Sequence, residues 1–520
     1  MSAQQTDTDT LAYRHSPYFH VGRADDLSGS DYWLYRALEI LPGFLSWLTI
    51  LGTFFLSYFF PVFAACFIIF FDLYWLLKTL YLSIHLRHNW KRIRFNMKID
   101  WQERMSGIRH EHFWHLIVLP YYNESLEIVD GAVGAIRDAR GDTSKMIVVL
   151  AGEERAGQES VEVAEKIKQT YAGVFAEILH TSHPANVVGE MPGKGSNASY
   201  ALEEARKHVL DKRQIPYEDV IVSNFDIDTV VPLDYFLCLT WHFATATNPY
   251  KTSFQPVPLY NNNIWQAPAF SRVVAMSSTF WQMVQQERPE KLATFSSHST
   301  SFRALYEVGY WQKNIVSEDS RIFWNLFLAH DGDYKVTPLS FPVSMDANLA
   351  PTFTQTLRNI YKQHRRWAWG VENVPYILFG FIKNKRIPFR KKASAAFVQL
   401  EGFWSLATNP LIIFLLGWLP LMLGGDAFRN TVLSRNLPVI TRDLMILSMC
   451  GLILSTIISL TLIPPPPPHL KIHHRLFMIL QWILVPITIV VFGALPGLDA
   501  QTRLMTKRYL GFWVTPKHRK

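Results

Sequence analysis

Long apolar runs alternate with stretches of ordinary polarity along this chain and divide it into three parts. No charged residue occurs in residues 41–71, and further apolar runs occupy residues 406–423, 444–463 and 476–495. A transmembrane helix needs about 20 mostly apolar residues, so these runs are long enough to cross a bilayer. The section between them, about residues 87–391, has the composition of a soluble domain. The pattern predicts a soluble domain inserted between two membrane segments.

The charges beside the apolar runs predict how the chain crosses the membrane. Residues 41–87 are long enough for two helices that turn at Pro61. The basic residues that follow place the soluble section in the cytoplasm, since such residues collect on that side: Arg87, Lys91, Arg92, Arg94 and Lys98. The C-terminal part has three clear runs and a shorter fourth, Ala393–Trp404, which carries Glu401. Charge favours four helices over three, so we expect about six in total, in an inner (plasma) membrane.

Six segments are therefore expected. No cleavable signal peptide is visible at the polar start of the chain. In order, we predict a disordered cytosolic tail (1–40), two transmembrane helices (41–87), a cytosolic domain (88–350), interfacial amphipathic helices (351–392), about four transmembrane helices (393–497) and a basic cytosolic tail (498–520).

Composition excludes some classes of protein. The three scattered cysteines argue against a disulfide framework or a cysteine-based metal site. The net charge of +8 could indicate a nucleic-acid binder, but the basic residues cluster beside apolar segments. The soluble section has no basic helix or aromatic stacking motif, so nucleic acid is not an expected partner.

Short apolar runs alternate with helical patterns inside the soluble section. Strands are predicted at residues 115–120, 146–150 and 219–223, and helices at 126–140 and 161–172. Such alternation predicts an α/β sheet, in which ligands bind beyond the carboxyl ends of the strands. The polar clusters that follow the three strands should therefore meet in one crevice.

Three of these polar clusters each allow two interpretations. Asp226 and Asp228 follow a strand and could share a divalent cation with phosphate oxygens, although D-x-D pairs also occur in loops by chance. Lys194, in PGKGSN, either lies in a flexible turn or approaches a nucleotide; the Walker spacing is absent. Glu318 and Asp319 fit the first turn of a helix capped by Ser317, yet a carboxylate at a pocket rim can also act as a general base.

A basic and aromatic stretch, KQHRRWAWG at residues 362–370, precedes the C-terminal apolar runs. It could anchor the protein at a membrane surface, or it could belong to an active site.

Taken in chain order, LPYYNES, GKGSN, FDID, SED and QHRRW resemble the motif series of membrane-embedded family 2 glycosyltransferases. Cellulose, hyaluronan and chitin synthases belong to that family. Gln363, Arg366 and Trp367 match its Q-x-x-R-W motif, and FWVTPK at residues 512–517 resembles the F-x-V-T-x-K gating loop of cellulose synthase. The resemblance covers about residues 115–370, the tail and the membrane plan. It implies a GT-A fold, an α/β, Rossmann-like nucleotide-diphospho-sugar transferase domain, between transmembrane helices.

The resemblance also implies roles for individual residues. Asp319 would be the general base, and the other catalytic residues would be Glu318, Gln363, Arg366 and Trp367. Mg²⁺ or Mn²⁺ would be bound by Asp226 and Asp228, with Asp228 as the main ligand. The nucleotide sugar would contact Tyr122, Asn123, Glu124, Glu153, Glu154, Lys194, Asp226, Thr515 and Lys517.

Two departures from the family pattern affect these assignments. The family has an Asp that contacts uracil after the second strand, where this chain has Glu153 and Glu154. In cellulose synthase further helices follow the gating motif, whereas here no apolar run follows it. The segment could be a lid over the nucleotide or a basic membrane-proximal tail.

The implied activity is inverting hexosyl transfer from a UDP-sugar to a growing polysaccharide, with which export could be coupled. The alternative is a non-processive enzyme that makes a glycolipid on a ceramide or polyprenyl-phosphate acceptor. A transporter or binding subunit with an inactive domain should lack a catalytic acid, but Asp226, Asp228 and Asp319 are all present. Expected partners are the nucleotide sugar, a carbohydrate or glycolipid acceptor and the bilayer. The sequence leaves open the sugar, the linkage, processivity, the oligomeric state and any export subunits.

Overall fold

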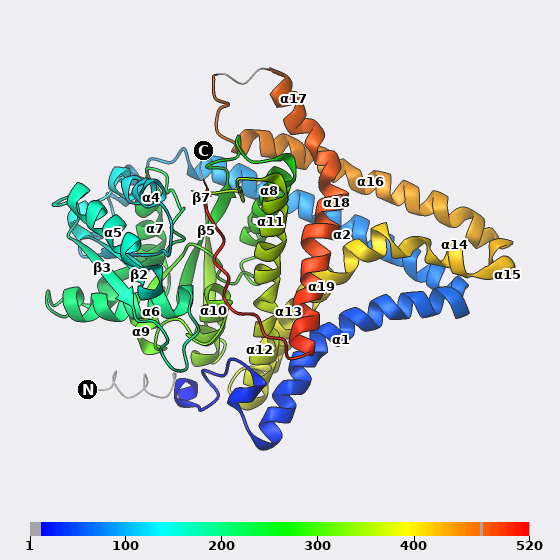
Figure 1. The fold of residues 1–520 in the computed structure, drawn as a ribbon, viewed down its shortest axis with the longest axis horizontal. Helices are drawn as coiled ribbons and strands as arrows, with labels where there is room; N and C mark the ends of the chain where they lie inside the picture. The colour runs from blue at the N-terminus through cyan, green and yellow to red at the C-terminus, as the bar shows by residue number, and fades with distance from the viewer. Residues whose placement is uncertain (1–11, 469–471, 519–520) are drawn as a thin grey trace.

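The computed structural model describes residues 12–468 and 472–518. A seven-stranded sheet lies at one end of the molecule, and long helices extend from the other (Figure 1). The strand order is β3-β2-β1-β4-β6-β5-β7. The strands are β1 (Trp114–Pro120), β2 (Met146–Glu153), β3 (Glu177–His183), β4 (Val220–Asn224), β5 (Thr252–Tyr260), β6 (His298–Ser301) and β7 (Lys335–Met345).

The direction of the strands gathers many loops at one edge. All strands run parallel except β6, which pairs antiparallel with both β4 and β5. The carboxyl ends of the parallel strands and the amino end of β6 therefore meet at the same edge, which we call the carboxyl edge. This mixed sheet confirms the predicted α/β class.

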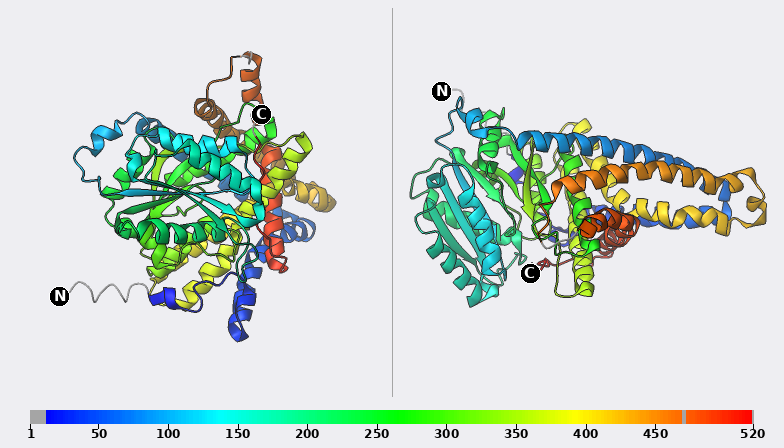
Figure 2. Two further views of the ribbon diagram at one scale, coloured as in Figure 1. Left: turned by 60° about the vertical axis from the view of Figure 1, so that its left-hand side comes forward. Right: turned by 90° about the horizontal axis from the view of Figure 1, so that it is seen from above.

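Helices cover both faces of the sheet, as Figure 2 shows. Successive residues of β1 point alternately into two cores: Leu116 and Val118 into one, Ile117 and Leu119 into the other. All four are fully buried, which explains why this strand has a continuous apolar sequence. The first core contains α6 (Lys194–Ala205), α9 (Phe302–Glu307) and α10 (Glu318–Ala329); the second contains α3 (Trp101–Met105), α4 (Leu126–Asp138), α5 (Gln158–Thr170) and α7 (Tyr235–Thr245).

Further helices lie between the sheet and the apolar end. They are α8 (Ala269–Gln286), α11 (Phe353–Ala368), the short 3₁₀ helix η8 (Trp369–Glu372) and α12 (Asn373–Lys383). The remaining α-helices of the described chain are α1 (Gly29–Phe59), α2 (Pro61–Asn96), α13 (Phe389–Phe414), α14 (Leu419–Leu423), α15 (Gly425–Arg429), α16 (Val432–Leu462), α17 (Ile472–Leu480), α18 (Val485–Ile489) and α19 (Leu495–Met505).

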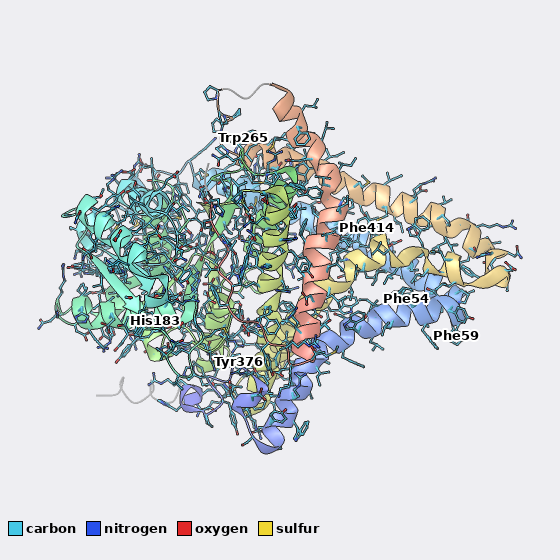
Figure 3. The ribbon with its side chains drawn as sticks, in the orientation of Figure 1. Phe54, Phe59, His183, Trp265, Tyr376 and Phe414 are labelled. Carbon is cyan, nitrogen blue, oxygen red and sulfur yellow. The ribbon has the colours of Figure 1, made fainter. Side chains whose placement is uncertain are left out.

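Four helical segments in the described part of the chain are long and apolar enough to cross a membrane: α1, α2, α16 and Leu476–Met505. A fifth is present if the pair Phe389–Phe414 and Leu416–Leu423, bent by 50°, is one span. Large apolar side chains point outward from these helices; Phe54 and Phe59 of α1 are 44% and 58% exposed (Figure 3).

The prediction of about six membrane helices is not confirmed. Residues 393–404 and 406–423 were expected to form two separate helices. Instead, Pro410 is buried inside α13, and the chain bends after Phe414. Helices α1, α2, α13 and α16 extend away from the sheet, whereas α18 and α19 run across their bases (Figures 1 and 2).

The N-terminal segment corrects a second expectation. We predicted a disordered tail over residues 1–40, but α1 already begins at Gly29. Phe19 is buried, and its carbonyl oxygen accepts a hydrogen bond from the Tyr376 hydroxyl at 2.8 Å. Gln312 likewise donates to the carbonyl of His20 at 2.9 Å. Residues 12–28 therefore belong to the folded domain, while residues 1–11 lie outside the described part.

Candidate active site

A buried lysine joins two acidic sequence motifs. Lys194, the first residue of α6, places Nζ 2.6 Å from Asp226 Oδ1 and 2.9 Å from Asp319 Oδ1. Asp226 follows β4, and Asp319 lies in the first turn of α10. Burial alone would raise the pKa of Asp226, but the charges of Lys194 and Lys517 outweigh it and hold that pKa well below its usual range. Burial likewise opposes the charged lysine, yet Asp226 and Asp319 raise the pKa of Lys194.

The acid beside Asp319 has a different environment. Glu318 is only 2% exposed, and its Oε1 has no hydrogen-bond partner among the described residues. Burial, together with the charge of Asp319, raises the pKa of Glu318 to about 8. Its environment therefore favours the protonated form of Glu318.

Glu318→Gln tests this protonation through stability. A carboxyl group whose pKa rises on folding stabilises the protein at low pH, and this contribution is lost as the pH rises toward the folded value. Gln cannot titrate, so we expect the wild type to lose thermal stability relative to the variant between about pH 5 and about pH 8. Melting curves of both proteins in detergent measure the difference. A difference that stays constant over this range would contradict a protonated Glu318.

The second aspartate of D-x-D is fully buried. Asp228 Oδ2 accepts hydrogen bonds from Lys517 Nζ at 2.6 Å and from the Asp346 backbone N–H at 2.9 Å. Its Oδ1 has no partner within the described chain. Asn262 Nδ2 links the segments that follow β4 and β7, because it donates to the Asp228 carbonyl and to Asp346 Oδ1, both at 3.0 Å.

The donor atoms here can be compared with the needs of a metal ion. The described residues contain no group of three or more His, Cys, Asp or Glu side chains arranged to hold a metal. Mg²⁺ and Mn²⁺ in nucleotide sites commonly take only one or two protein carboxylates and obtain their other ligands from phosphate and water. The unpartnered oxygen of Asp228, with Asp226 nearby, fits such a site. In this conformation the Lys517 ammonium group neutralises Asp228.

The C-terminal segment crosses the carboxyl edge of the sheet (Figure 1). The Phe512 ring packs against Gly193, where an added Cβ would lie 2.6 Å from Phe512 Cγ. The guanidinium of Arg366 lies 5.1 Å from the centre of the same ring, and Lys362 Nζ lies 5.4 Å from the Trp513 ring. Residues 512–517 therefore contact both the Lys194 loop and the Q-x-x-R-W helix. Thr515, also in this segment, is only 7% exposed.

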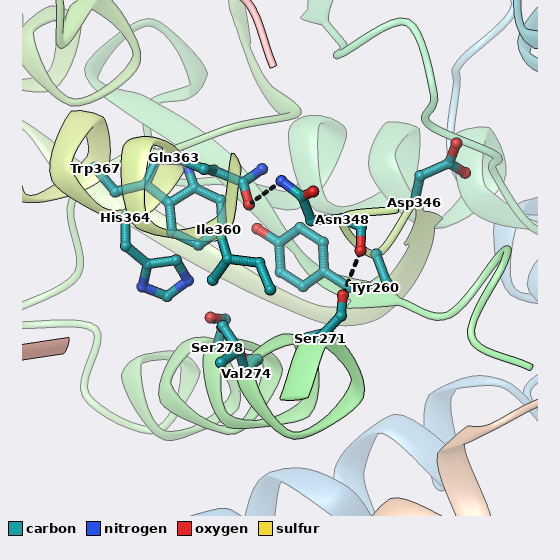
Figure 4. Close-up of a pocket in the computed structure, with 12 residues that line it drawn as sticks. Tyr260, Ser271, Val274, Ser278, Asp346, Asn348, Ile360, Gln363, His364 and Trp367 are labelled. Atoms are coloured by element: carbon teal, nitrogen blue, oxygen red, sulfur yellow. Dashed lines mark hydrogen bonds between the residues drawn. The ribbon is translucent and has the colours of Figure 1, made fainter. Parts of the chain in front are cut away.

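Gln363 and Trp367 of α11 line a pocket beside this cluster (Figure 4). The Trp367 ring lies 5.9 Å from the ring of Tyr260 and 4.8 Å from that of His364. Gln363 Oε1 accepts a hydrogen bond from Asn348 Nδ2 at 3.5 Å. The pocket thus combines aromatic faces with amide groups.

Two other residues of this stretch differ from a surface anchor. Trp369 is 1% exposed and donates its indole N–H to Glu372 Oε2 at 2.8 Å. Arg365 Nη1 pairs with Asp499 Oδ2 of α19 at 3.0 Å. Burial therefore excludes Trp369 as a surface anchor, and Arg365 joins α11 to α19.

One candidate nucleotide residue, Glu153, lines a neighbouring hollow at the ends of β2 and β3, and Tyr122 and Glu154 contact residues that line it. The Arg155 guanidinium stacks 4.6 Å from the centre of the Tyr122 ring and forms an ion pair with Glu153. Glu154 Oε2 accepts the backbone N–H of Ala185 at 2.7 Å. The hollow is also lined by His183, Asn186, Glu190 and Pro192.

Glu124 and Asn123 follow Tyr122 at the same strand end. Glu124 Oε2 accepts the backbone N–H of Tyr122 at 2.7 Å, and burial raises the pKa of Glu124. Asn123 is exposed. The structure therefore gathers Lys194, Asp226, Asp228, Glu318, Asp319 and Lys517 in one cluster. Glu124 lies close enough to interact with the charges of Lys517 and Asp228, and Arg366 with that of Glu318.

Several residues of the cluster carried no recognisable motif. Ser296 donates to Asp226 Oδ2, and His298 Nδ1 lies 3.9 Å from Asp319 Oδ1. Tyr260 and Asp346 come from the ends of β5 and β7. The polar run SSHSTS at residues 296–301 was the available signal, because such a run is unusual for a fully buried strand.

Glu372 was also missed, and it changes the interpretation of Ser317. We had considered Ser317 as the cap of α10, but its side chain makes no capping hydrogen bond. The Ser317 hydroxyl instead donates to Glu372 Oε1 at 2.7 Å.

Comparison with solved structures gives weak global similarity. A mannosyltransferase from Pyrobaculum calidifontis, in complex with GDP-Man and Mn²⁺, has a TM-score of 0.41 and 13% sequence identity, covering 74% of this chain and 99% of that one. Residues 1–349 of Staphylococcus aureus TarS, in complex with UDP-GlcNAc, have a TM-score of 0.33 and 12% identity, covering 67% and 91%.

Comparison with sequences is more informative. Poly-beta-1,6-N-acetyl-D-glucosamine synthases from Staphylococcus aureus strains, such as COL and N315, are 23% identical to this chain over 326 residues, which is 62% of this chain and 68% of the relative. The model of glycosyl transferase family group 2 matches residues 221–495, which is more than half of the chain. The chain therefore belongs to glycosyl transferase family group 2.

Proposed function

We propose that this glycosyltransferase moves a sugar from a UDP-sugar to the end of a growing polysaccharide, with inversion at the anomeric carbon. The observation that carries the proposal is the cluster in which Lys194 contacts Asp226 and Asp319 under the C-terminal segment. The cluster brings together a carboxylate that can act as a base, two carboxylates that can hold a metal-bound diphosphate, and Lys517 of the C-terminal segment. Similarity to poly-beta-1,6-N-acetyl-D-glucosamine synthases supports a polymer product and makes UDP-N-acetylglucosamine the first donor to test.

In the proposed reaction Asp319 is the general base. An acceptor hydroxyl attacks the anomeric carbon, and its proton passes to the Asp319 carboxylate. The bond between that carbon and the diphosphate breaks, so UDP leaves and an α-linked donor gives a β-linked product. Lys194 fixes Asp319 beside Asp226, and both acids therefore face the same reacting centre.

The leaving diphosphate needs positive charge around it. Arg366 is suited to this role, because its guanidinium keeps its charge and matches phosphate geometry. Its Nε has no hydrogen-bond partner in the described part of the chain, so it has capacity for a ligand. Mg²⁺ or Mn²⁺ held by Asp228 and Asp226 would neutralise further phosphate charge. Thr515 and Lys517 would then close over the nucleotide.

Donor and acceptor are assigned to opposite sides of the cluster. We assign the nucleoside to the hollow near Tyr122, Glu153 and Glu154, with Asn123 and Glu124 at its edge. The pocket in Figure 4 has room for about one water molecule in this conformation, so the acceptor sugar is assigned to its rim, where the half-exposed Trp367 offers an apolar ring face beside the Gln363 amide. Aromatic faces beside amide groups suit a sugar ring, which has both C–H faces and hydroxyl edges.

The proposed location is the cytoplasmic side of an inner membrane. Exposed basic residues near the end of α2 support this orientation, since they follow the positive-inside pattern: Arg87, Lys91, Arg92, Arg94 and Lys98.

The experiment is UDP release by the purified full chain in nanodiscs, over a panel of UDP-sugars with Mg²⁺ or Mn²⁺. We expect release with one donor, loss of release in Asp228→Ala, and a ladder of radiolabelled products. A single discrete lipid-soluble product would instead identify a glycolipid synthase. If no donor is used or bound by folded protein, the assignment of a UDP-sugar fails.

Lys517→Ala tests whether the tail competes with the metal. The ammonium lies 2.6 Å from Asp228 Oδ2, so a cation must displace it to use that oxygen. We expect the variant to bind Mn²⁺ in the absence of donor about tenfold more tightly, which corresponds to about 1.4 kcal/mol. Calorimetric titration of Mn²⁺ into donor-free protein measures this and excludes any loss of nucleotide contacts made by Lys517. Arg508→Ala, an exposed tail residue, is the matched control; equal Mn²⁺ affinities in all three proteins would refute the competition.

A further inference from the structure

Glu372 is a buried carboxylate immediately after the Q-x-x-R-W helix. It ends η8 and is 7% exposed. Its Oε1 accepts three hydrogen bonds: from the backbone N–H groups of Val316 (3.0 Å) and Ser317 (2.7 Å) and from the Ser317 hydroxyl (2.7 Å). Its Oε2 accepts the indole N–H of Trp369 at 2.8 Å. Four donors thus satisfy a charge that would otherwise be costly to bury.

Three of these donors belong to the two residues that lead directly into α10. The first N–H groups of a helix lack partners within the helix, and a side chain at its start commonly supplies one. Ser317 makes no such capping bond here. Instead, Glu372 fixes the backbone that enters the helix, and the next two residues of the chain are Glu318 and Asp319. A carboxylate near this end also interacts favourably with the helix dipole.

The neighbouring residue holds the same turn of α10 from the other side. Asn373 Nδ2 donates to Ser320 Oγ at 2.8 Å, and its Oδ1 accepts from Arg321 Nε. Arg321 is fully buried and also donates to the Glu372 carbonyl at 3.2 Å. Residues 372 and 373 therefore both form hydrogen bonds with the start of α10. Both residues come after the helix that carries Arg366 and Trp367.

We propose that Glu372 is a positioning residue that sets the location of Asp319 relative to the Q-x-x-R-W helix. The inference rests on the proposed function, because it needs Asp319 to be the base. Glu372 does not reach the reacting atoms; it acts by fixing Val316 and Ser317. A displacement of about 1 Å in a catalytic group can lower a rate by about 100-fold. The loss should appear in kcat, because the side-chain hydrogen bonds of Glu372 within the described chain go to Val316, Ser317 and Trp369 and not to residues assigned to the donor.

Glu372→Gln is the principal variant, because it keeps the volume of the side chain. One carboxylate oxygen becomes an NH₂ group, which cannot accept a hydrogen bond. The amide must therefore give up either the Trp369 contact or the contacts to α10, and it is uncharged. Trp369→Phe is the matched control: it removes the indole donor from the same cluster and leaves all three contacts to α10.

The experiment measures kcat and the donor KM by UDP release, and the melting temperature, for the full chain in nanodiscs. We expect Glu372→Gln to lower kcat by about 10-fold to about 100-fold, with KM unchanged within about twofold. Trp369→Phe should retain most of the wild-type kcat. Glu372→Asp keeps the charge and should recover part of the kcat lost in Glu372→Gln, which provides a second test if the Gln variant folds poorly.

Three results would overturn the positioning role. The first is a wild-type kcat in both Glu372→Gln and Glu372→Leu, because Leu can accept none of the three hydrogen bonds from Val316 and Ser317. The second is an equal loss in Trp369→Phe, and the third is a kcat loss accompanied by a matching rise in KM and fall in melting temperature, which indicates general destabilisation. Failure of the folded wild type to release UDP from any donor would instead overturn the proposed function, and a wild-type kcat in Asp319→Asn would show that another group is the base, so these failures are distinguishable.

Discussion

Replacement of Asp319 by asparagine is expected to lower kcat by about 10³-fold, because general-base catalysis contributes about 10²-fold to 10⁴-fold and an amide cannot accept the proton. The side chain keeps its size, and its amide oxygen can still accept a hydrogen bond from Lys194, which lies 2.9 Å from Asp319 Oδ1. Donor binding should therefore persist. Single-turnover UDP formation measures the chemical step, and calorimetry measures donor affinity.

Asp333→Asn provides the control for this variant. Asp333 is an acid of the same domain whose side chain is 71% exposed, and it pairs with Lys251 away from the cluster. Its replacement should leave kcat unchanged. If Asp319→Asn retained activity similar to that of Asp333→Asn, another group would have to be the base.

Lys194→Met is expected to have the largest effect on stability. Removal of one partner leaves Asp226 and Asp319 close together without their shared cation, and breaking such a buried ion pair typically costs about 3–5 kcal/mol. Asp226 retains some solvent contact, with a side chain 29% exposed, so we expect about 3 kcal/mol, the lower end. Transfer activity should also be lost. Denaturant unfolding in detergent with EDTA measures the free energy.

The pH dependence of this deficit is a stricter test. The pKa of Asp226 is depressed in the folded protein, so its stabilisation is present above its unfolded value of about 4 and is lost as the pH falls below it. The difference between wild type and Lys194→Met should therefore shrink in acid. Lys207→Met, which removes an exposed lysine beside Glu203 and Glu204, should show little deficit. A Lys194→Met deficit that does not depend on pH would refute this account.

The strands that the sequence predicted are those with continuous apolar residues. β1, β2 and β4 are buried on both faces, and each was located to within a few residues. β5 and β7 were missed, since Pro256 and Pro258 interrupt one and Pro338 and Pro342 the other. Proline cannot donate to a ladder and normally argues against a central strand. These two strands pair in parallel around an irregularity between Gln255 and Val257.

The site residues that could be predicted are those that follow the strands with continuous apolar sequences. Side chains after the apolar strands, such as Asp226 and Asp228, could be placed together from strand direction alone. Asp346 could not, because the strand that delivers it was not recognised. Glu372 lies 55 residues from Ser317, with which it forms a hydrogen bond, so no local spacing could predict the contact. The sequence could not decide whether Lys194 lies in a flexible turn or in the site. The structure decides it, because the Lys194 side chain contacts the carboxylates of both Asp226 and Asp319.

The contact between Lys517 and Asp228 has a topological consequence. It puts residue 517 on the same side of the bilayer as the sheet, and the packing of Phe19 against Tyr376 puts the segment before α1 there too. A chain that leaves one side and returns must cross an even number of times. If α1, α2 and α16 each cross the bilayer, the bent pair Phe389–Phe414 and Leu416–Leu423 and the segment Leu476–Met505 cannot both be complete crossings, because together they would make five. The tail that carries Lys517 follows directly on Leu476–Met505, so whichever of the two does not cross fixes how that tail reaches the sheet.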